Sequence, residues 1–131
     1  MPAQSQQAAG RGKKAIPGTS KNYSAAIEAG EYVFLSGVLG TKEGKLVEGG
    51  IKPETTQALD NLKETLAKSG LSLSNGVKVT VFIKNLEDFQ AMNEVYRTYF
   101  PADPPARSTV VAGLVLGNAN IEIDLIAYRG K

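Results

Sequence analysis

Hydrophobic and polar positions alternate, or β-branched and aromatic residues cluster, in five short segments after residue 23, and both patterns are typical of β-strands. The predicted strands are residues 25–28, 32–35, 77–83, 108–111 and 121–127. Only a short turn at Gly30 separates the first two, so they form a predicted hairpin. One side of the third strand is wholly apolar and is expected in the core: Val77, Val79, Val81 and Ile83.

Two further segments follow helical spacing. The first helix is predicted to begin at Pro53 and presents one apolar face, formed by Ala58, Leu59, Leu62 and Leu66. The second begins with the acidic Glu87 and Asp88, ends before Pro101, and carries Phe89, Met92, Tyr96 and Tyr99 at steps of three and four. The element order β-β-α-β-α-β-β predicts an α+β domain, with both helices on one face of a mostly antiparallel or mixed sheet.

Residues 1–20 show neither pattern and mix Gln, Ala, Gly, Ser and Pro with basic residues, which predicts a flexible N-terminal tail before a single domain at 21–131. We therefore expect that deleting residues 1–18 leaves folding and activity nearly unchanged. The tail contains no acidic residue, as in a mitochondrial transit peptide, but it has almost no large apolar residue to form an amphipathic face. The glycines between residues 37 and 50 predict a mobile loop, because they match no phosphate-binding pattern.

Composition narrows the chemistry that this chain can perform. It has 131 residues, no Cys and no His, which excludes disulfides, thiolate nucleophiles, Ser-His triads and nearly all zinc sites. Neither a metal nor a cofactor is expected. The net charge of +2 does not favour nucleic acid as a partner, and no apolar run is long enough to span a membrane. A cytoplasmic protein is expected, with the mitochondrial matrix as the alternative.

Two charged residues stand out near the C-terminus. Arg107 follows the rigid Pro104-Pro105 connector, which would fix its backbone while its guanidinium stays free to bind a carboxylate with two hydrogen bonds. Glu122 and Asp124 share one face of a predicted strand. Taken alone, these residues have simpler explanations: Arg107 can be a surface residue or the ion-pair partner of Glu122, and alternating charges can be a solvated strand face.

The residues around these two positions closely resemble the C-terminal signature of the Rid/YjgF family. The matching segments are Pro105-Ala-Arg-Ser-Thr-Val-Val-Ala-Gly-Leu and Asn120-Ile-Glu-Ile-Asp-Leu-Ile-Ala. The resemblance continues upstream through Val79-Thr-Val-Phe-Ile-Lys-Asn-Leu-Glu-Asp-Phe, Asn93, Phe34-Leu-Ser-Gly and Tyr23. It covers roughly residues 21–130 in order, and the N-terminal tail lies outside it.

This resemblance implies a chorismate-mutase-like (YjgF-like) α+β fold that assembles as a homotrimer with clefts between subunits. It also implies a 2-iminobutanoate/2-iminopropanoate deaminase, which hydrolyses reactive 2-imino acids, formed from enamines such as 2-aminoacrylate, to 2-keto acids and ammonia. In this family the position of Arg107 binds the substrate carboxylate and that of Glu122 handles the attacking water. The substrate-binding positions of the family correspond to Tyr23, Ser36, Asn93, Arg107 and Thr109.

Thr109 departs from the family pattern, because many members have a cysteine there. We interpret this position as contributing its backbone, since hydrolysis of an activated imine needs no covalent intermediate. Two other function classes stay open. The family is also associated with endoribonuclease and translation-inhibitor activity, and the same cleft could serve a chaperone-like trimer or a small-ligand sensor without catalysis.

Overall fold

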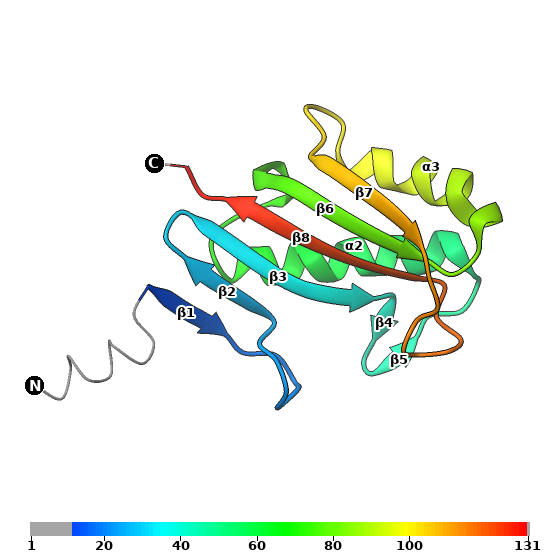
Figure 1. The fold of residues 1–131 in the computed structure, drawn as a ribbon, viewed down its shortest axis with the longest axis horizontal. Coiled ribbons are helices and arrows are strands. Elements are labelled where there is room, and N and C mark those ends of the chain that lie inside the picture. The colour runs from blue at the N-terminus through cyan, green and yellow to red at the C-terminus, as the bar shows by residue number, and fades with distance from the viewer. Residues whose placement is uncertain (1–11, 131) are drawn as a thin grey trace, which may run out of the picture.

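The computed structural model describes residues 12–130, which form a six-stranded sheet covered on one face by two helices (Figure 1). The strand order is β1-β2-β3-β8-β6-β7. The strands are β1 (Lys13–Ile16), β2 (Ala26–Ala29), β3 (Tyr32–Leu39), β6 (Gly76–Ile83), β7 (Ala106–Val111) and β8 (Ile121–Tyr128). The helices are α2 (Ile51–Ala67) and α3 (Phe89–Tyr99). A short 3-10 helix, η1 (Leu73–Asn75), precedes β6, and a second one, η2 (Leu86–Asp88), precedes α3.

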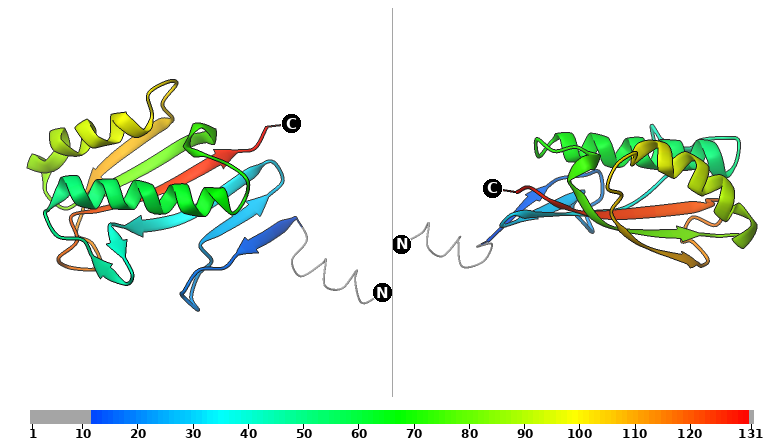
Figure 2. Two further views of the ribbon diagram at one scale, coloured as in Figure 1. Left: turned by 180° about the vertical axis from the view of Figure 1, so that it is seen from behind. Right: turned by 90° about the horizontal axis from the view of Figure 1, so that it is seen from above.

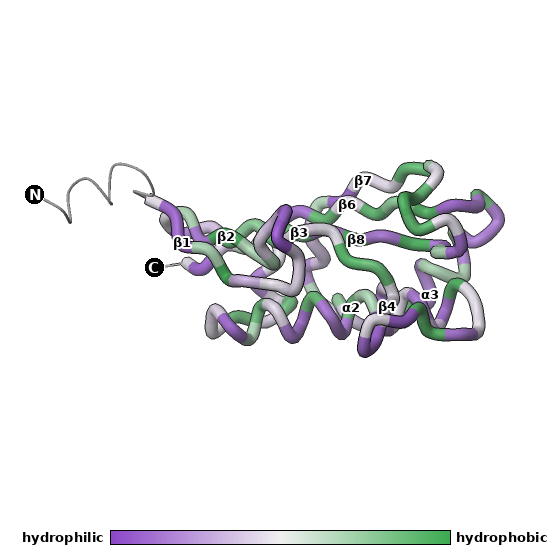
Figure 3. The backbone as a smooth tube through the Cα atoms, turned by 90° about the horizontal axis from the view of Figure 1, so that it is seen from below, coloured by the Kyte–Doolittle hydropathy of each residue, from purple (hydrophilic) through white to green (hydrophobic). Residues whose placement is uncertain are grey.

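Both helices lie on the same side of the sheet, as the edge-on views show (Figures 2 and 3), so the predicted α+β architecture is confirmed. The predicted apolar face of α2 is fully buried, and Met92 and Tyr96 of α3 are buried beside it. Hydrophobic and hydrophilic residues alternate along β8 (Figure 3), and its apolar side chains join this core. No helix within residues 12–130 is long and apolar enough to cross a membrane.

The sheet is mixed, and its C-terminal strand lies in the middle. β8 pairs antiparallel with β3 on one side and with β6 on the other. β6 and β7 pair in parallel, and α3 forms the crossover between them. The two halves of the sheet, β1-β2-β3 and β6-β7, therefore meet only through β8.

The predicted tail is too long, because residues 13–16 form the edge strand β1, which pairs antiparallel with β2. Three of its four side chains are exposed, so the strand carries almost no hydrophobic pattern, but Ile16 is buried in the core. Residues 1–11 lie outside the described part of the chain.

Three other expectations are corrected. Val77 is exposed and not part of the core, because the pairing of β6 with β8 shifts register between Gly76 and Lys78. The glycine-rich segment is not one loop: Gly37 lies within β3, and β4 (Thr41–Lys42) pairs with β5 (Lys45–Leu46) in a small hairpin. Helix α2 begins at Ile51, two residues before the predicted Pro53.

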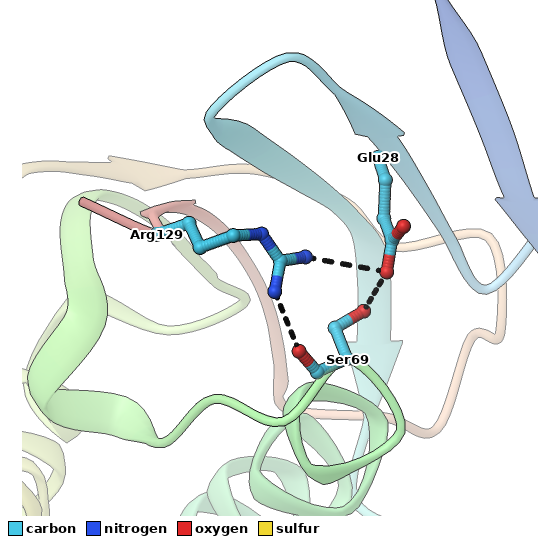
Figure 4. A network of polar contacts seen from close by, with 3 residues as sticks. All are labelled: Glu28, Ser69 and Arg129. Atoms are coloured by element: carbon cyan, nitrogen blue, oxygen red, sulfur yellow. Dashed lines mark hydrogen bonds and ion pairs between the residues drawn. The ribbon is translucent and has the colours of Figure 1, made fainter. Parts of the chain in front are cut away.

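A polar network fixes the C-terminal end of the chain against β2 and α2 (Figure 4). The Ser69 hydroxyl donates to Glu28 Oε2 at 2.7 Å, and Arg129 Nη2 lies 3.3 Å from the same oxygen. Arg129 Nη1 also donates to the Ser69 carbonyl at 2.9 Å. These contacts, led by the hydrogen bond from Ser69, lower the pKa of Glu28 below its ordinary value.

Candidate functional site

Arg107 lies on the edge strand β7 and points toward α3. Its Cζ atom is 4.7 Å from the centroid of the Tyr96 ring and 5.8 Å from that of Phe89, so two aromatic side chains hold the guanidinium. The adjoining cavity has a volume of about 290 Å³ and is lined by Asn93, Tyr96, Arg97, Phe100, Pro104, Pro105 and Arg107. A fixed guanidinium in a partly apolar pocket is suited to bind a small carboxylate.

Glu122 lies on β8 in a second cavity of about 440 Å³, which is lined by Tyr23, Ser36, Gly37, Leu39, Val115, Leu116 and Glu122. Partial burial raises the pKa of the Glu122 carboxyl, and the neighbouring charge of Asp124 adds to this rise. A carboxyl group with a raised pKa in a cavity is a candidate general base or acid.

Gly37 makes the position of Glu122 possible. A Cβ atom at residue 37 would lie 3.1 Å from Cδ of Glu122 and closer still to one of its carboxylate oxygens. The backbone of β3 is irregular here, because its pairing with β8 shifts register between Leu35 and Val38. The Glu122 carboxyl thus packs directly against backbone that has no side chain.

The remaining predicted residues divide between the two cavities. Ser36 and Tyr23 lie with Glu122, and the Ser36 hydroxyl donates a hydrogen bond of 2.6 Å to the Ser24 carbonyl, which leaves its oxygen free to accept one. Asn93 lies with Arg107. Thr109 is two residues beyond Arg107 on β7 and therefore faces the same side of the sheet.

Arg107 and Glu122 point to opposite faces of the sheet. Arg107 pairs in register with the buried Val79, which lies on the helix side, whereas Glu122 pairs with Phe82 on the open side. Val79 and Phe82 are three positions apart on β6. The backbones of Arg107 and Glu122 are therefore separated by roughly 10 Å along the strands and by roughly 10 Å across them. No ion pair joins these side chains within residues 12–130, so the simple explanation of Arg107 and Glu122 as partners in one chain is wrong.

Comparison with known proteins identifies the family. The family model described as Endoribonuclease L-PSP, the YjgF/Rid family, matches residues 13–129. This chain belongs to the Rid/YjgF family. The match begins at the first residue of β1, in agreement with the finding that the folded part starts earlier than predicted.

Among its relatives, the chain is 47% identical over 107 residues to Reactive Intermediate Deaminase A, chloroplastic, of Arabidopsis thaliana, covering 80% of this chain and 57% of the relative. It is 41% identical over 106 residues to the 2-iminobutanoate/2-iminopropanoate deaminase of Dermatophagoides farinae, covering 79% and 83% of the two chains. The crystal structure of yeast Mmf1 superposes with a TM-score of 0.82 at 35% identity, covering 88% of this chain and 94% of that one.

Sequence reasoning missed several residues of this Rid/YjgF chain that border the two cavities. Phe89 and Tyr96 support Arg107, Gly37 lies under Glu122, and Val115 and Leu116 line the rim of the second cavity. Their spacing predicted a helix but not a contact with Arg107, because an apolar stripe at helical spacing is the same in a core and at a site. Val115 and Leu116 stand outside every predicted element, and an apolar pair in a loop is the one signal that they offered.

A cavity of about 670 Å³ between α2, α3 and η1 contains none of the predicted site residues. Three hydroxyl groups that line this cavity already have hydrogen-bond partners in the protein. The Tyr99 hydroxyl donates to Asp60 at 2.9 Å, and the Ser72 and Ser74 hydroxyls are bonded to each other. No group of three or more acidic residues within 12–130 could hold a metal ion. Arg107 and Glu122 are therefore kept as the candidate functional residues.

Proposed function

We propose that this chain is a deaminase that hydrolyses 2-imino acids to 2-keto acids and ammonia, without a cofactor. The observation that carries the proposal is the guanidinium of Arg107, fixed over the Tyr96 ring at the edge of a cavity sized for a small acid. The names of relatives such as the Dermatophagoides farinae protein supply the reaction class.

We propose further that the working site forms between two copies of the chain in a homotrimer, with Arg107 from one copy and Glu122 from the next. Two observations support this. Arg107 and Glu122 face opposite sides of the sheet, so one small substrate cannot touch both within a chain. The open face of the sheet also exposes large apolar side chains, which are typical of a surface covered by another subunit: Tyr32, Phe34, Val110 and Tyr128.

In the proposed reaction, Arg107 binds the carboxylate of a protonated imine and Glu122 removes a proton from a water molecule. The water oxygen bonds to C2 as the C=N π electrons move to nitrogen, and the Ser36 oxygen accepts a hydrogen bond from the imine N–H. Glu122 then returns this proton to the amino group. It next takes the proton of the C2 hydroxyl as the C=O bond forms and the C–N bond breaks, and the departing ammonia receives that proton and leaves as ammonium. The raised pKa of Glu122 suits these transfers near neutral pH.

The test generates 2-iminobutanoate in solution with an amino-acid oxidase, traps it with semicarbazide, and measures whether this protein accelerates its loss. Arg107→Lys keeps the charge but loses the two-pronged contact, so KM should rise strongly. Glu122→Gln removes the proton acceptor, so kcat should fall by roughly 10² or more with a smaller change in KM. Thermal melting of the same preparations checks that both variants are folded, and full activity in both would contradict the mechanism.

RNA cleavage is the second candidate function, because the family description names an endoribonuclease. The chain gives it less support, since it has no His for acid–base catalysis and a net charge of only +2. Salt distinguishes the two candidates: RNA binding weakens steeply as salt rises, whereas turnover of a small anion changes modestly.

The cytoplasm is the compartment that we propose, with the mitochondrial matrix as the alternative.

A further inference from the structure

The hydroxyl of Tyr96 is buried without a hydrogen-bond partner. Tyr96 is 6% exposed, and its hydroxyl is the one buried side-chain polar group within residues 12–130 that makes no hydrogen bond there. Leaving such a group unpaired costs free energy, so each example in a folded protein requires an explanation. A phenylalanine at this position would keep the packing and avoid the cost.

The arginines that line the same cavity cannot accept the proton of this hydroxyl, and Asn93 makes no hydrogen bond with it. Tyr96 lines the 290 Å³ cavity together with Arg107, Arg97 and Asn93. A guanidinium only donates hydrogen bonds, so neither arginine can accept the proton of the hydroxyl. Burial raises the pKa of Tyr96, while the charge of Arg107 and its contact with the hydroxyl oppose this rise, so the hydroxyl keeps its proton at neutral pH.

We propose that Tyr96 is a ligand-binding residue, whose hydroxyl donates a hydrogen bond to the same carboxylate that Arg107 binds while its ring holds the guanidinium. A carboxylate offers about four acceptor sites, and two from Arg107 leave room for a third donor. The choice of a 2-keto or 2-imino acid as the ligand rests on the proposed function. The donor set of Tyr96 and Arg107 requires only a small carboxylate.

The test compares Tyr96→Phe with Tyr99→Phe, a matched control on the same helix. Tyr99 donates to Asp60 at 2.9 Å and lines the cavity of about 670 Å³ between α2, α3 and η1, which does not include Arg107. Calorimetry measures binding of 2-oxobutanoate, the product of the proposed reaction, to the full chain, and melting is followed on the same samples. Tyr96→Phe should raise Kd and KM by about 10-fold or more with the melting temperature unchanged or higher. Tyr99→Phe should lower the melting temperature and leave Kd unchanged.

Each other outcome overturns the inference. Unchanged Kd in Tyr96→Phe would show that the hydroxyl does not touch the ligand, and a lower melting temperature in that variant would show that it has a partner in the protein. Failure of the wild-type chain to bind 2-oxobutanoate would remove the carboxylate site altogether. The proposed function fails separately, when the wild-type chain binds 2-oxobutanoate but hydrolyses no imine.

Discussion

At the scale of single residues, the position of the Glu122 carboxyl depends on the hydrogen atom that Gly37 has in place of a side chain. Gly37 does not have a positive φ, so its backbone conformation is open to any residue. A side chain at residue 37 would instead collide with the carboxyl group of Glu122. Gly37 is therefore a positioning residue for the proposed general base.

Gly37→Ala should displace the Glu122 carboxyl and lower kcat for imine hydrolysis by about 10- to 100-fold. Glu122→Asp shortens the side chain by one methylene and makes room for the new methyl group. The double variant should therefore be more active than Gly37→Ala alone, although Glu122→Asp by itself lowers kcat. Steady-state kinetics on the four proteins measures this coupling.

Gly113→Ala is the matched control, because an added Cβ at Gly113 meets no atom within 4 Å and its φ is not positive. Its kinetics should equal those of the wild type. If Gly37→Ala and the double variant lose activity equally, the loss comes from a disturbed strand and not from the carboxyl of Glu122.

The sequence predicted Arg107 and Glu122 as site residues, because both lie within segments that match the Rid/YjgF family. It could not identify what holds them. The contact of Gly37 with Glu122 joins neighbouring strands that are far apart in the chain, and a glycine in a strand can equally mark a turn or a loop. The unpaired hydroxyl of Tyr96 is visible only once the three-dimensional neighbours of that hydroxyl are known.

At the scale of elements, β1 covers the edge of β2 and places Ile16 in the core. Deleting residues 2–16 removes this strand, so we expect the melting temperature to fall by about 5 °C or more, from the lost burial of Ile16 and the lost strand pairing. This replaces the expectation that deletion through residue 18 is harmless. Calorimetric melting measures the change.

Deletion of residues 2–11 is the control for the strand, because it ends before both β1 and the family match begin. Its melting temperature should stay near that of the full chain. Equal melting temperatures for both deletions would mean that β1 contributes nothing measurable to stability.

The network of Glu28, Ser69 and Arg129 makes part of the stability depend on pH. The folded state lowers the pKa of Glu28, so its contribution is complete above the ordinary Glu value near 4.5 and is lost as pH falls through the lowered value. Glu28→Gln should therefore melt at a lower temperature than wild type at pH 7, and the difference should shrink below about pH 4.5. Melting curves from pH 3 to 7 measure it.

Glu31→Gln serves as the control, because the exposed Glu31 carboxylate, in the turn between β2 and β3, makes no hydrogen bond or ion pair within the described chain. It should melt close to wild type at every pH. A difference between Glu28→Gln and wild type that does not change with pH would contradict the linkage.

Periodicity predicted α2, α3 and the central strands well, since each buries one continuous apolar side. The edge strand β1 was not predicted, because the sequence KKAI buries only its last residue. Pairing with β2 stabilises this strand, although it has almost no hydrophobic pattern of its own. The shift at Val77 also follows from pairing with β8, which no local window contains. Long-range pairing, not local propensity, decided these elements.

At the scale of the whole molecule, the separation of Arg107 and Glu122 provides a test of assembly. Three chains of 13.9 kDa should scatter light as a particle of about 42 kDa. Unfolding an equal mixture of Arg107→Ala and Glu122→Gln and refolding it should restore activity, because about one quarter of the clefts then receive both native residues. Each variant refolded alone should stay inactive.

Wild-type protein taken through the same unfolding and refolding is the control, and its recovered activity sets the scale for the mixture. If the mixture is as inactive as each variant alone, the two residues do not meet across a subunit boundary. Arg107 and Glu122 would then act in separate sites or within one chain. A stable monomer or dimer in light scattering would contradict the trimer directly.

The central place of β8 has a consequence for the order in which this chain is made. Synthesis proceeds from the N-terminus, so β1-β2-β3 and β6-α3-β7 emerge first, each with one open strand edge where β8 will later bind. Neither edge is closed until residues 121–128 have left the ribosome. A product that stops before Ile121 therefore exposes the unpaired edges of β3 and β6, which favour aggregation.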